Sequence, residues 1–238
     1  MNKIEIKAPD GLSITANLYE SEHIVSPVFI LCHQAGFSRG EYIETAEYFF
    51  KQGFTCIAID QRSGGEVNGI LNETHKAAVA AGKPTNYTDA VQDIEAAIVY
   101  ATKEYPEAKK VLLGSSYSAS LALIMGVKYA DVLTAVVSFS PGEYFELANK
   151  SIAAWAKDLQ LPVFISSAKA EVDGWAGIFE TIPAANKIGF KPTGNGIHGS
   201  RNLWLSTANH PEYRSALEKF IHSLQLTDIA QQKKTLLR

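Results

Sequence analysis

Short, continuously apolar runs alternate with stretches of helical periodicity along most of the chain, and this alternation limits the fold more than any other feature. A strand that is apolar at every position must be covered on both faces, which requires a mainly parallel sheet with helices on either side. The sequence therefore predicts an α/β fold. Strands are expected at 27–32, 54–59, 110–114, 133–139, 162–166 and 186–190. Helices are expected at 39–52, 88–105, 118–129, 143–159, 175–181 and 211–224.

The N-terminal part of the chain follows a different pattern. Two stretches of alternating apolar and polar residues, 3–8 and 12–19, flank Pro9-Asp10-Gly11. This tripeptide is typical of a tight turn between two strands. An antiparallel hairpin at one edge of the sheet is therefore expected.

No repeat, low-complexity tract or shift in composition marks a domain boundary, so we expect one domain over 1–238. Two segments look irregular. Segment 61–86 is long for a connection in a compact domain, and such loops often line binding sites, so it is a candidate active-site loop. The polar tail 227–238 is expected to be a frayed end, with an oligomer contact as the alternative.

Composition excludes several classes of function. The 22 basic and 25 acidic residues give a net charge of −3 without a basic stripe, which argues against nucleic acid as the partner. No apolar run approaches the roughly 20 residues of a membrane span. Residues 1–7 lack the apolar core of a secretory signal, so a cytoplasmic location is expected. The two cysteines, Cys32 and Cys56, fall inside predicted strands and form no metal-binding motif, so neither metal nor cofactor is expected.

The clearest chemical signal is Gly114-Ser115-Ser116-Tyr117-Ser118, which joins a predicted strand directly to a predicted helix. This is the context of a nucleophile elbow, where a strained serine needs small residues two positions before and after it. Ser116 meets this condition, and Ser118 is a formal alternative. Serines also cap helix N-termini, so capping is the alternative explanation. A nucleophile additionally needs a base, a carboxylate and oxyanion donors, all at the carboxyl ends of the strands.

Candidates for these partners follow later strands. His198 comes after the last strand, in a glycine-rich loop, and is the candidate base. That loop matches G-x-G-x-x-G, but it lacks the βαβ context of a dinucleotide-binding motif. Glu171 and Asp173 both follow the strand at 162–166 and are alternative acids. The order serine, acid, histidine is that of nucleophile-elbow hydrolases.

Oxyanion donors are expected at the turn His33-Gln34-Ala35-Gly36, which follows the first apolar strand. The backbone amide of Ala35 is the first candidate and that of Gln34 the second. The amide of Tyr117 would supply the other donor. His33 precedes the turn and is expected to brace it rather than to act as a base.

Taken together, these motifs resemble the α/β-hydrolase superfamily, and within it the cap-poor branch of dienelactone-hydrolase-like proteins and small esterases. The resemblance extends from Leu12 to Leu224. It rests on the turn at 33–36, Asp60-Gln61-Arg62-Ser63-Gly64-Gly65, the elbow, the strand end before Glu171, and His198-Gly199. It implies an eight-stranded, mainly parallel sheet without a large cap domain, and it places Glu171 rather than Asp173 at the acid position.

The sequence departs from that pattern in three ways. Ser118 stands where the elbow usually ends in glycine, and Gln34 stands where glycine usually follows the loop histidine. The candidate nucleophile is serine, whereas dienelactone hydrolases use cysteine. Arg62 matches an arginine that usually has a structural role in the family; carboxylate binding is the alternative.

The sequence thus predicts a serine hydrolase that cleaves ester or related acyl bonds of a small substrate through an acyl-enzyme. Ser116, His198 and Glu171 would be the catalytic residues, and Arg62, Trp175 and Trp204 are candidates for substrate contact. An acyl-peptidase or amidase with the same triad is one alternative. A non-catalytic hydrolase-fold binding protein is another. A small acyl compound is the expected partner, without nucleic acid or membrane, and a homo-oligomer is possible.

Overall fold

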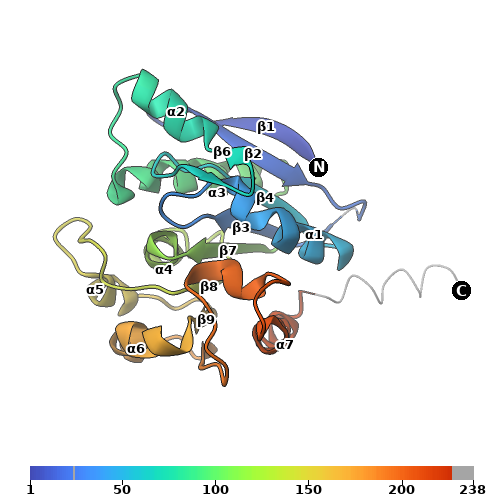
Figure 1. Ribbon diagram of the computed structural model, residues 1–238, viewed down its shortest axis with the longest axis vertical. Coiled ribbons are helices and arrows are strands. Elements are labelled where there is room, and N and C mark those ends of the chain that lie inside the picture. Colours follow the sequence, from blue (N-terminus) through green and yellow to red (C-terminus); the bar gives the residue numbers. More distant parts are fainter. Residues whose placement is uncertain (24, 227–238) are drawn as a thin grey trace, which may run out of the picture.

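A computed structural model describes residues 1–23 and 25–226, so the predicted tail at 227–238 lies outside the described residues. Its central element is an eight-stranded sheet with the order β1-β2-β4-β3-β7-β8-β9-β10 (Figure 1). The hairpin β1 (Asn2–Lys7) and β2 (Ser13–Tyr19) forms one edge, and β2 pairs antiparallel with β4. The other pairings within this sheet are parallel. The predicted edge hairpin and mainly parallel sheet are confirmed.

The parallel strands agree closely with the apolar runs of the sequence. Their bounds are β3 Val28–Cys32, β4 Thr55–Ile59, β7 Lys110–Ser115, β8 Ala135–Phe139, β9 Val163–Ser166 and β10 Lys187–Phe190. All residues of β3, β4, β7, β8 and β9 are buried, because successive side chains enter cores on opposite faces of the sheet. In β3, for example, Phe29 and Leu31 enter one core, and Ile30 and Cys32 enter the other.

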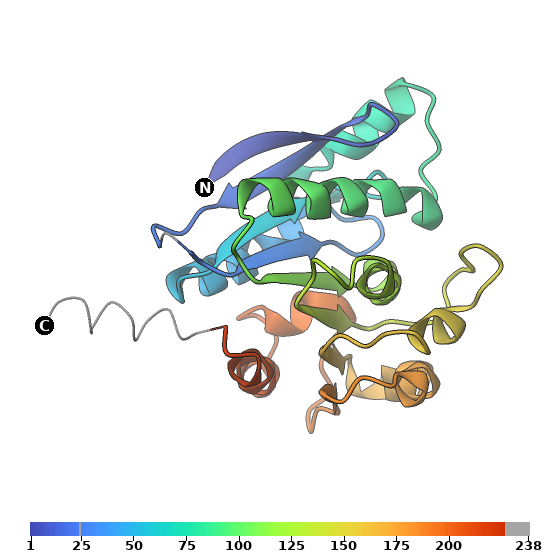
Figure 2. The same cartoon turned by 180° about the vertical axis from the view of Figure 1, so that it is seen from behind.

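Helices cover both faces of the sheet. On one face lie α1 (Ile43–Lys51) and α7 (His210–Ser223). On the other lie α3 (Val91–Glu104), α4 (Tyr117–Lys128), α5 (Ile152–Ala156) and α6 (Val172–Thr181), and Figure 2 shows α3 running across this face. The described residues also include four 3₁₀ turns: η1 Arg39–Tyr42, η2 Tyr87–Ala90, η3 Lys169–Glu171 and η4 Gly199–Leu203.

The segment 61–86 is more regular than its composition suggested. It contains the two-stranded ribbon of β5 (Glu66–Val67) and β6 (Ile70–Leu71), followed by α2 (Glu73–Ala80). The prediction of an irregular loop is therefore wrong in its middle. The turn Asn68-Gly69, with φ of 53° and 72°, permits the tight hairpin, and the Asn72 side chain caps α2 by accepting from the His75 amide.

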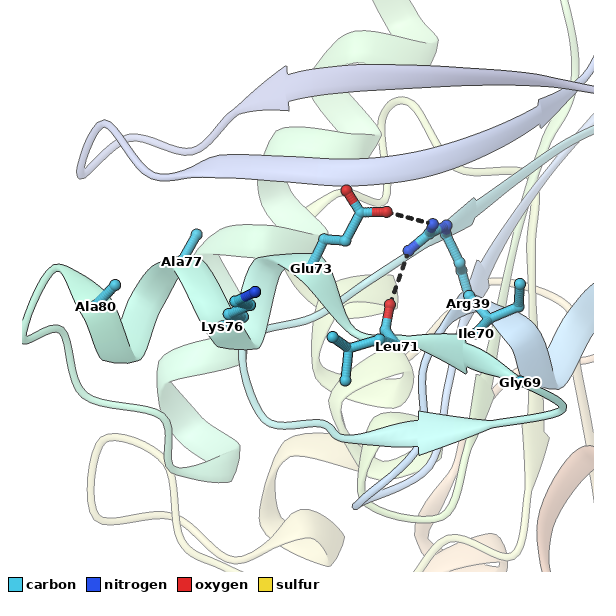
Figure 3. A pocket seen from close by; sticks show the side chains of 8 residues that line it. All are labelled: Arg39, Gly69, Ile70, Leu71, Glu73, Lys76, Ala77 and Ala80. Atoms are coloured by element: carbon cyan, nitrogen blue, oxygen red, sulfur yellow. Dashed lines mark hydrogen bonds and ion pairs between the residues drawn. The ribbon is translucent and has the colours of Figure 1, made fainter.

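A groove of about 700 Å³ runs along this ribbon and helix (Figure 3). The Arg39 guanidinium enters it, but donates to the Glu73 carboxylate at 2.7 Å and to the Leu71 carbonyl at 3.2 Å. Arg39 also forms an ion pair with the buried Asp60. Its charge is therefore compensated within the fold, and none of the candidate catalytic side chains lines this groove.

The helix predicted at 143–159 is much shorter than expected. Only Ile152–Ala156 is helical, and the chain from 140 to 151 is a loop (Figure 1). Ala148 and Asn149 have φ of 51° and 57°, which a right-handed α-helix does not accommodate. The Glu143 carboxylate accepts from the amides of Ile152 and Ala153, and so ends the loop at the first turn of α5.

Among the described residues, no helix is long and apolar enough to cross a membrane. Between β8 and β9 the chain forms only this loop and α5, so no large cap domain is inserted there.

Candidate active site

Ser116 occupies the sharp turn between β7 and α4, with φ 59° and ψ −123°. Such strain in a residue other than glycine is typical of functional turns. Gly114 makes the turn possible, because a Cβ there would lie 2.2 Å from the Ser118 carbonyl oxygen. The amide of Ser116 donates to the Phe139 carbonyl of the neighbouring strand at 2.8 Å, which ties the turn to the sheet. The structure thus has the predicted elbow geometry at Ser116.

Ser118 has a different position from Ser116. Its side chain is fully buried, and its Oγ donates to the His33 carbonyl at 2.6 Å and accepts from the Gln61 side-chain amide at 2.5 Å. The hydroxyl that replaces the usual glycine therefore connects the elbow to the turn at 33–36. It does not face the candidate base.

The structure brings Ser116, His198 and Glu171 together from three separate loops. Nε2 of His198 lies 2.8 Å from Oγ of Ser116, and Nδ1 of His198 lies 2.7 Å from Oε1 of Glu171. A neutral imidazole that donates from Nδ1 to the carboxylate presents Nε2 as an acceptor for the serine hydroxyl proton. This arrangement has the geometry of a nucleophile, base and orienting acid.

Glu171 rather than Asp173 is the carboxylate that lies beside His198 Nδ1. Asp173 is exposed, in the first turn of α6. The second oxygen of Glu171 accepts from the Ser140 hydroxyl at 2.7 Å. Burial raises the pKa of the Glu171 carboxyl, but hydrogen bonds from His198 and Ser140 outweigh this effect and hold the pKa below its ordinary value. The carboxyl is therefore ionised at neutral pH.

Ser140 is a site residue that the sequence reasoning missed. Its Oγ donates to Glu171 and also accepts from the Gly199 amide at 2.9 Å. One hydroxyl therefore connects Glu171 to the segment 193–200 that carries His198, the histidine loop. Ser140 follows β8 directly and has φ of 57°. The available signal was its place at the carboxyl end of a strand next to the elbow, where polar residues gather around a crevice.

The turn at 33–36 presents the amide of Ala35. His33 Nδ1 donates to the Gln34 carbonyl at 2.8 Å, and the Phe37 amide donates to the same oxygen at 3.2 Å. Since the C=O and N–H of one peptide unit point in opposite directions, the Ala35 N–H points away from these two groups.

His33 is buried and braces this turn, as expected. Its Nε2 accepts from the Gln61 amide at 2.9 Å. Burial also lowers the pKa of His33, which keeps the ring neutral. A neutral ring with Nδ1 protonated and Nε2 free satisfies both hydrogen bonds at once.

Gln34, the second candidate for the oxyanion donor of this turn, does not have a free amide. Its amide donates to Oε2 of Glu41 at 2.7 Å, so that prediction is wrong. Tyr117 is the first residue of α4, and the amide of a first helical residue has no acceptor inside its helix. Within the described part of the chain, the amides of Ala35 and Tyr117 are both left without an acceptor.

Two of the predicted substrate contacts are wrong. Arg62 is completely buried and forms ion pairs with Asp93 at 2.8 Å and Asp10 at 2.9 Å. It therefore stabilises the fold and is inaccessible to a substrate. Trp175 is 1% exposed, and its indole N–H donates to the Ser167 hydroxyl at 2.7 Å. Its ring belongs to the core beneath α6, where Ile178 of the same helix is also buried.

Trp204 is half-buried, and its indole N–H donates to the Glu41 carbonyl at 2.9 Å. Contact between its ring and a substrate stays a prediction.

Two exposed aromatic residues near the elbow had not been singled out from the sequence. The Tyr87 ring stacks on the buried Tyr117 ring, with centroids 4.5 Å apart. The Tyr144 hydroxyl donates to the Ser140 carbonyl at 2.8 Å. Tyr87 is 38% exposed and Tyr144 is 42% exposed, so both offer aromatic surface beside the loops that carry Ser116 and Glu171. Each lies in a loop or short turn, where apolar periodicity gives no signal.

Together, the sheet order, the elbow after β7 and the acid and histidine on later strand ends define a hydrolase with the α/β-hydrolase fold. Residues 24–171 match the family model described as serine aminopeptidase, S33, and the chain belongs to this family. The matched region includes Ser116 and Glu171. A search of curated proteins found no match.

Solved structures share this fold over nearly the whole chain. A *Pyrococcus furiosus* esterase, Pf2001, aligns with a TM-score of 0.69 and 17% identity, covering 93% of this chain and 91% of its own. A dienelactone hydrolase from *Anabaena variabilis* gives a TM-score of 0.71 and 12% identity, covering 93% and 96%. Est1E from *Butyrivibrio proteoclasticus*, with bound ferulic acid, gives 0.69 and 13%, covering 93% and 98%.

Proposed function

We propose that this protein is a serine hydrolase that cleaves carboxylic esters of small substrates, with Ser116 as the nucleophile. The observation that carries the proposal is the continuous hydrogen-bonded row from Ser116 through His198 to Glu171, with distances of 2.8 and 2.7 Å. Structural neighbours named as esterases and a dienelactone hydrolase support the choice of an ester as substrate.

In the first half of the reaction, His198 Nε2 takes the hydroxyl proton as Ser116 Oγ attacks the ester carbonyl. Glu171 stabilises the imidazolium that forms and keeps its ring oriented. The amides of Ala35 and Tyr117 donate to the oxygen of the tetrahedral intermediate. The intermediate then collapses, and His198 gives the proton to the departing alcohol.

In the second half, His198 takes a proton from water, and the resulting nucleophile attacks the acyl-Ser116 carbonyl. Collapse of this second intermediate breaks the acyl–oxygen bond. His198 returns the proton to Ser116, and the carboxylic acid leaves. All four proton transfers pass through one nitrogen, Nε2, which explains why the ring must be fixed from its other side.

The loop architecture favours small substrates. No large cap domain lies between β8 and β9, and the aromatic surface of Tyr87 and Tyr144 stands beside the elbow instead. Stacking of these side chains against an acyl or alcohol group would supply binding energy without a charged partner. The arrangement is suited to an uncharged ester.

Hydrolysis of an aminoacyl amide is the second candidate, and the description of the family as serine aminopeptidases favours it. The same triad would attack an amide carbonyl, with His198 protonating the amine as it leaves. The two candidates differ in leaving group and in the need to recognise a free α-amino group.

The test is a direct comparison of p-nitrophenyl acetate and butyrate with aminoacyl p-nitroanilides, using wild type, Ser116→Ala and Ser118→Ala. We expect the wild type to prefer the esters in kcat/KM, Ser116→Ala to lose turnover, and Ser118→Ala to retain measurable turnover. Preference for the anilides would replace the esterase by the aminopeptidase. A folded wild type that is inactive on both classes would favour a non-catalytic binding protein.

A further inference from the structure

Glu41 is a fully buried carboxylate in η1, and the proposed reaction gives it no role. Buried acids are rare in proteins unless their oxygens are hydrogen-bonded. Oε2 of Glu41 accepts from the Gln34 amide at 2.7 Å, and Oε1 accepts from the Ser200 hydroxyl at 2.6 Å. The Ser200 amide in turn donates to the Ser115 hydroxyl at 2.9 Å.

Each of these partners is a close chain neighbour of a residue in the proposed machinery. Gln34 precedes Ala35, Ser115 precedes Ser116, and Ser200 follows His198 by two positions. The carboxyl group of Glu41 therefore connects the turn at 33–36, which carries the candidate oxyanion donor, to the histidine loop. Through Ser200, which donates to Ser115, it is also connected to the elbow. These three loops are otherwise separated by long stretches of sequence.

The peptide unit between His33 and Gln34 is held at both ends. Its carbonyl oxygen accepts from Ser118 Oγ at 2.6 Å, and its N–H donates to Glu41 at 2.7 Å. With both groups engaged, the plane of this peptide cannot rotate without breaking a buried hydrogen bond. The next peptide unit carries the Ala35 N–H, and its carbonyl oxygen accepts from His33 Nδ1 and the Phe37 amide. The two units are joined at Gln34, so fixing the first plane restricts the direction in which the Ala35 N–H can point.

We propose that Glu41 is a positioning residue for the oxyanion hole, which holds the Ala35 amide in register with Ser116 and His198. The inference rests on the proposed function. Oxyanion donors act only when they meet the position that the charged oxygen will occupy, and loss of one donor costs about 10²–10³-fold in kcat. A misaligned donor should therefore affect transition-state binding and leave ground-state substrate binding nearly unchanged.

The chain offers variants that separate this role from simple packing. Glu41→Leu removes both acceptors at nearly constant volume. Glu41→Gln keeps an oxygen for the Gln34 amide and gains a nitrogen that can donate to Ser200 Oγ. Glu44→Leu is the matched control, because Glu44 lies nearby in α1 and bonds to Leu205 and Arg214 but to none of the three connected loops.

The experiment measures kcat and KM for p-nitrophenyl acetate, inhibition by phenylboronic acid and the thermal unfolding midpoint for each variant. Phenylboronic acid forms a tetrahedral serine adduct and so reports on the oxyanion hole. We expect Glu41→Leu to lower kcat at least tenfold, to weaken boronate binding in parallel, and to change KM less than threefold. Glu41→Gln should recover most of the lost kcat, and Glu44→Leu should keep wild-type kcat.

A Glu41→Leu protein that is folded and retains wild-type kcat and boronate affinity would overturn the inference. So would a loss of kcat that Glu41→Gln does not recover. Should Glu41→Leu fail to fold, Ser200→Ala removes one of the two contacts and must still lower kcat and boronate affinity together. A wild-type protein that is inactive and forms no boronate adduct would overturn both the proposed function and the role of Glu41. An active wild type whose kcat and boronate affinity do not change in Glu41→Leu would overturn only the role of Glu41.

Discussion

Nε2 of His198 lies 2.8 Å from Oγ of Ser116, although the two residues are 82 positions apart in the chain. The elbow fixes one of these atoms through a strained backbone, and Glu171 with Ser140 fixes the other through hydrogen bonds.

The identity of the acid can be tested by separate substitutions. Glu171→Gln keeps the size of the side chain but removes the charge that stabilises the imidazolium. We expect kcat to fall on the order of 10⁴-fold, as for the equivalent change in a serine protease triad. Asp173→Asn should leave kcat within a factor of two of wild type. Steady-state kinetics on a p-nitrophenyl ester gives both values, and the reverse pattern would transfer the role to Asp173.

Ser140→Ala should reduce the stabilisation of the Glu171 carboxylate while leaving Glu171 itself in place. The substitution deletes a donor to Glu171 and an acceptor for the Gly199 amide, so the pKa of Glu171 should rise toward its ordinary value. We expect kcat to fall about 10- to 100-fold, since a hydrogen bond to a charged group contributes about 1.5–3 kcal/mol. A kcat–pH profile measures the change. Unchanged kinetics across the profile would remove Ser140 from the site.

Arg62 provides a test of a role in stability instead of substrate binding. Its guanidinium is buried against Asp93, so Arg62→Leu leaves a buried carboxylate without its partner. Breaking such a pair typically costs about 3–5 kcal/mol. Urea unfolding should show this loss, while the relative kcat/KM for acidic and neutral esters stays the same in the folded fraction. A change in that ratio with little loss of stability would restore Arg62 as a substrate contact.

Glu212 should make the anchoring of the histidine loop depend on pH. Burial raises the pKa of its carboxyl, but hydrogen bonds from Asn209, Thr193 and Gly194 dominate and lower the pKa from 4.5 to about 2. Because the folded pKa is depressed, this contribution to stability is present above pH 4.5 and is lost as the pH falls toward 2.

The corresponding experiment compares the free energy of unfolding of wild type and Glu212→Gln between pH 7 and pH 2.5. Wild type should be the more stable protein at pH 7, and the difference should shrink as the pH falls below 4.5. A difference that stays constant with pH would show that the charge of Glu212 is not involved.

The sequence was sufficient to predict the fold, and it singled out the three side chains that the structure brings together, because both leave local signals. Fully apolar strands such as Val28–Cys32 are recognised as short apolar runs in the sequence. The elbow at Ser116 is readable because it needs Gly114 at a fixed spacing. The acid and the base follow strand ends, so the topology placed them near one another before any distance was known.

What the sequence could not reveal depends on contacts between distant segments. The Gln34 amide was the second candidate for an oxyanion donor, after that of Ala35, but it donates to Glu41, which lies in a turn later in the chain. Trp175 was expected at the wall of the site, but its ring packs in the core beneath α6. For Arg62 a structural role was expected and carboxylate binding was the alternative, but its partners Asp93 and Asp10 could not be identified from the sequence. Each error concerns the partner of a side chain, which local pattern does not encode.

The most direct test of the account is the site of covalent reaction. The folded wild-type protein would be treated with a fluorophosphonate probe, followed by intact-mass and peptide mass spectrometry. The account predicts one phosphonyl group per chain, on Ser116, with no adduct in Ser116→Ala. Absence of any adduct in the folded wild type, or an adduct that persists in Ser116→Ala, would contradict it.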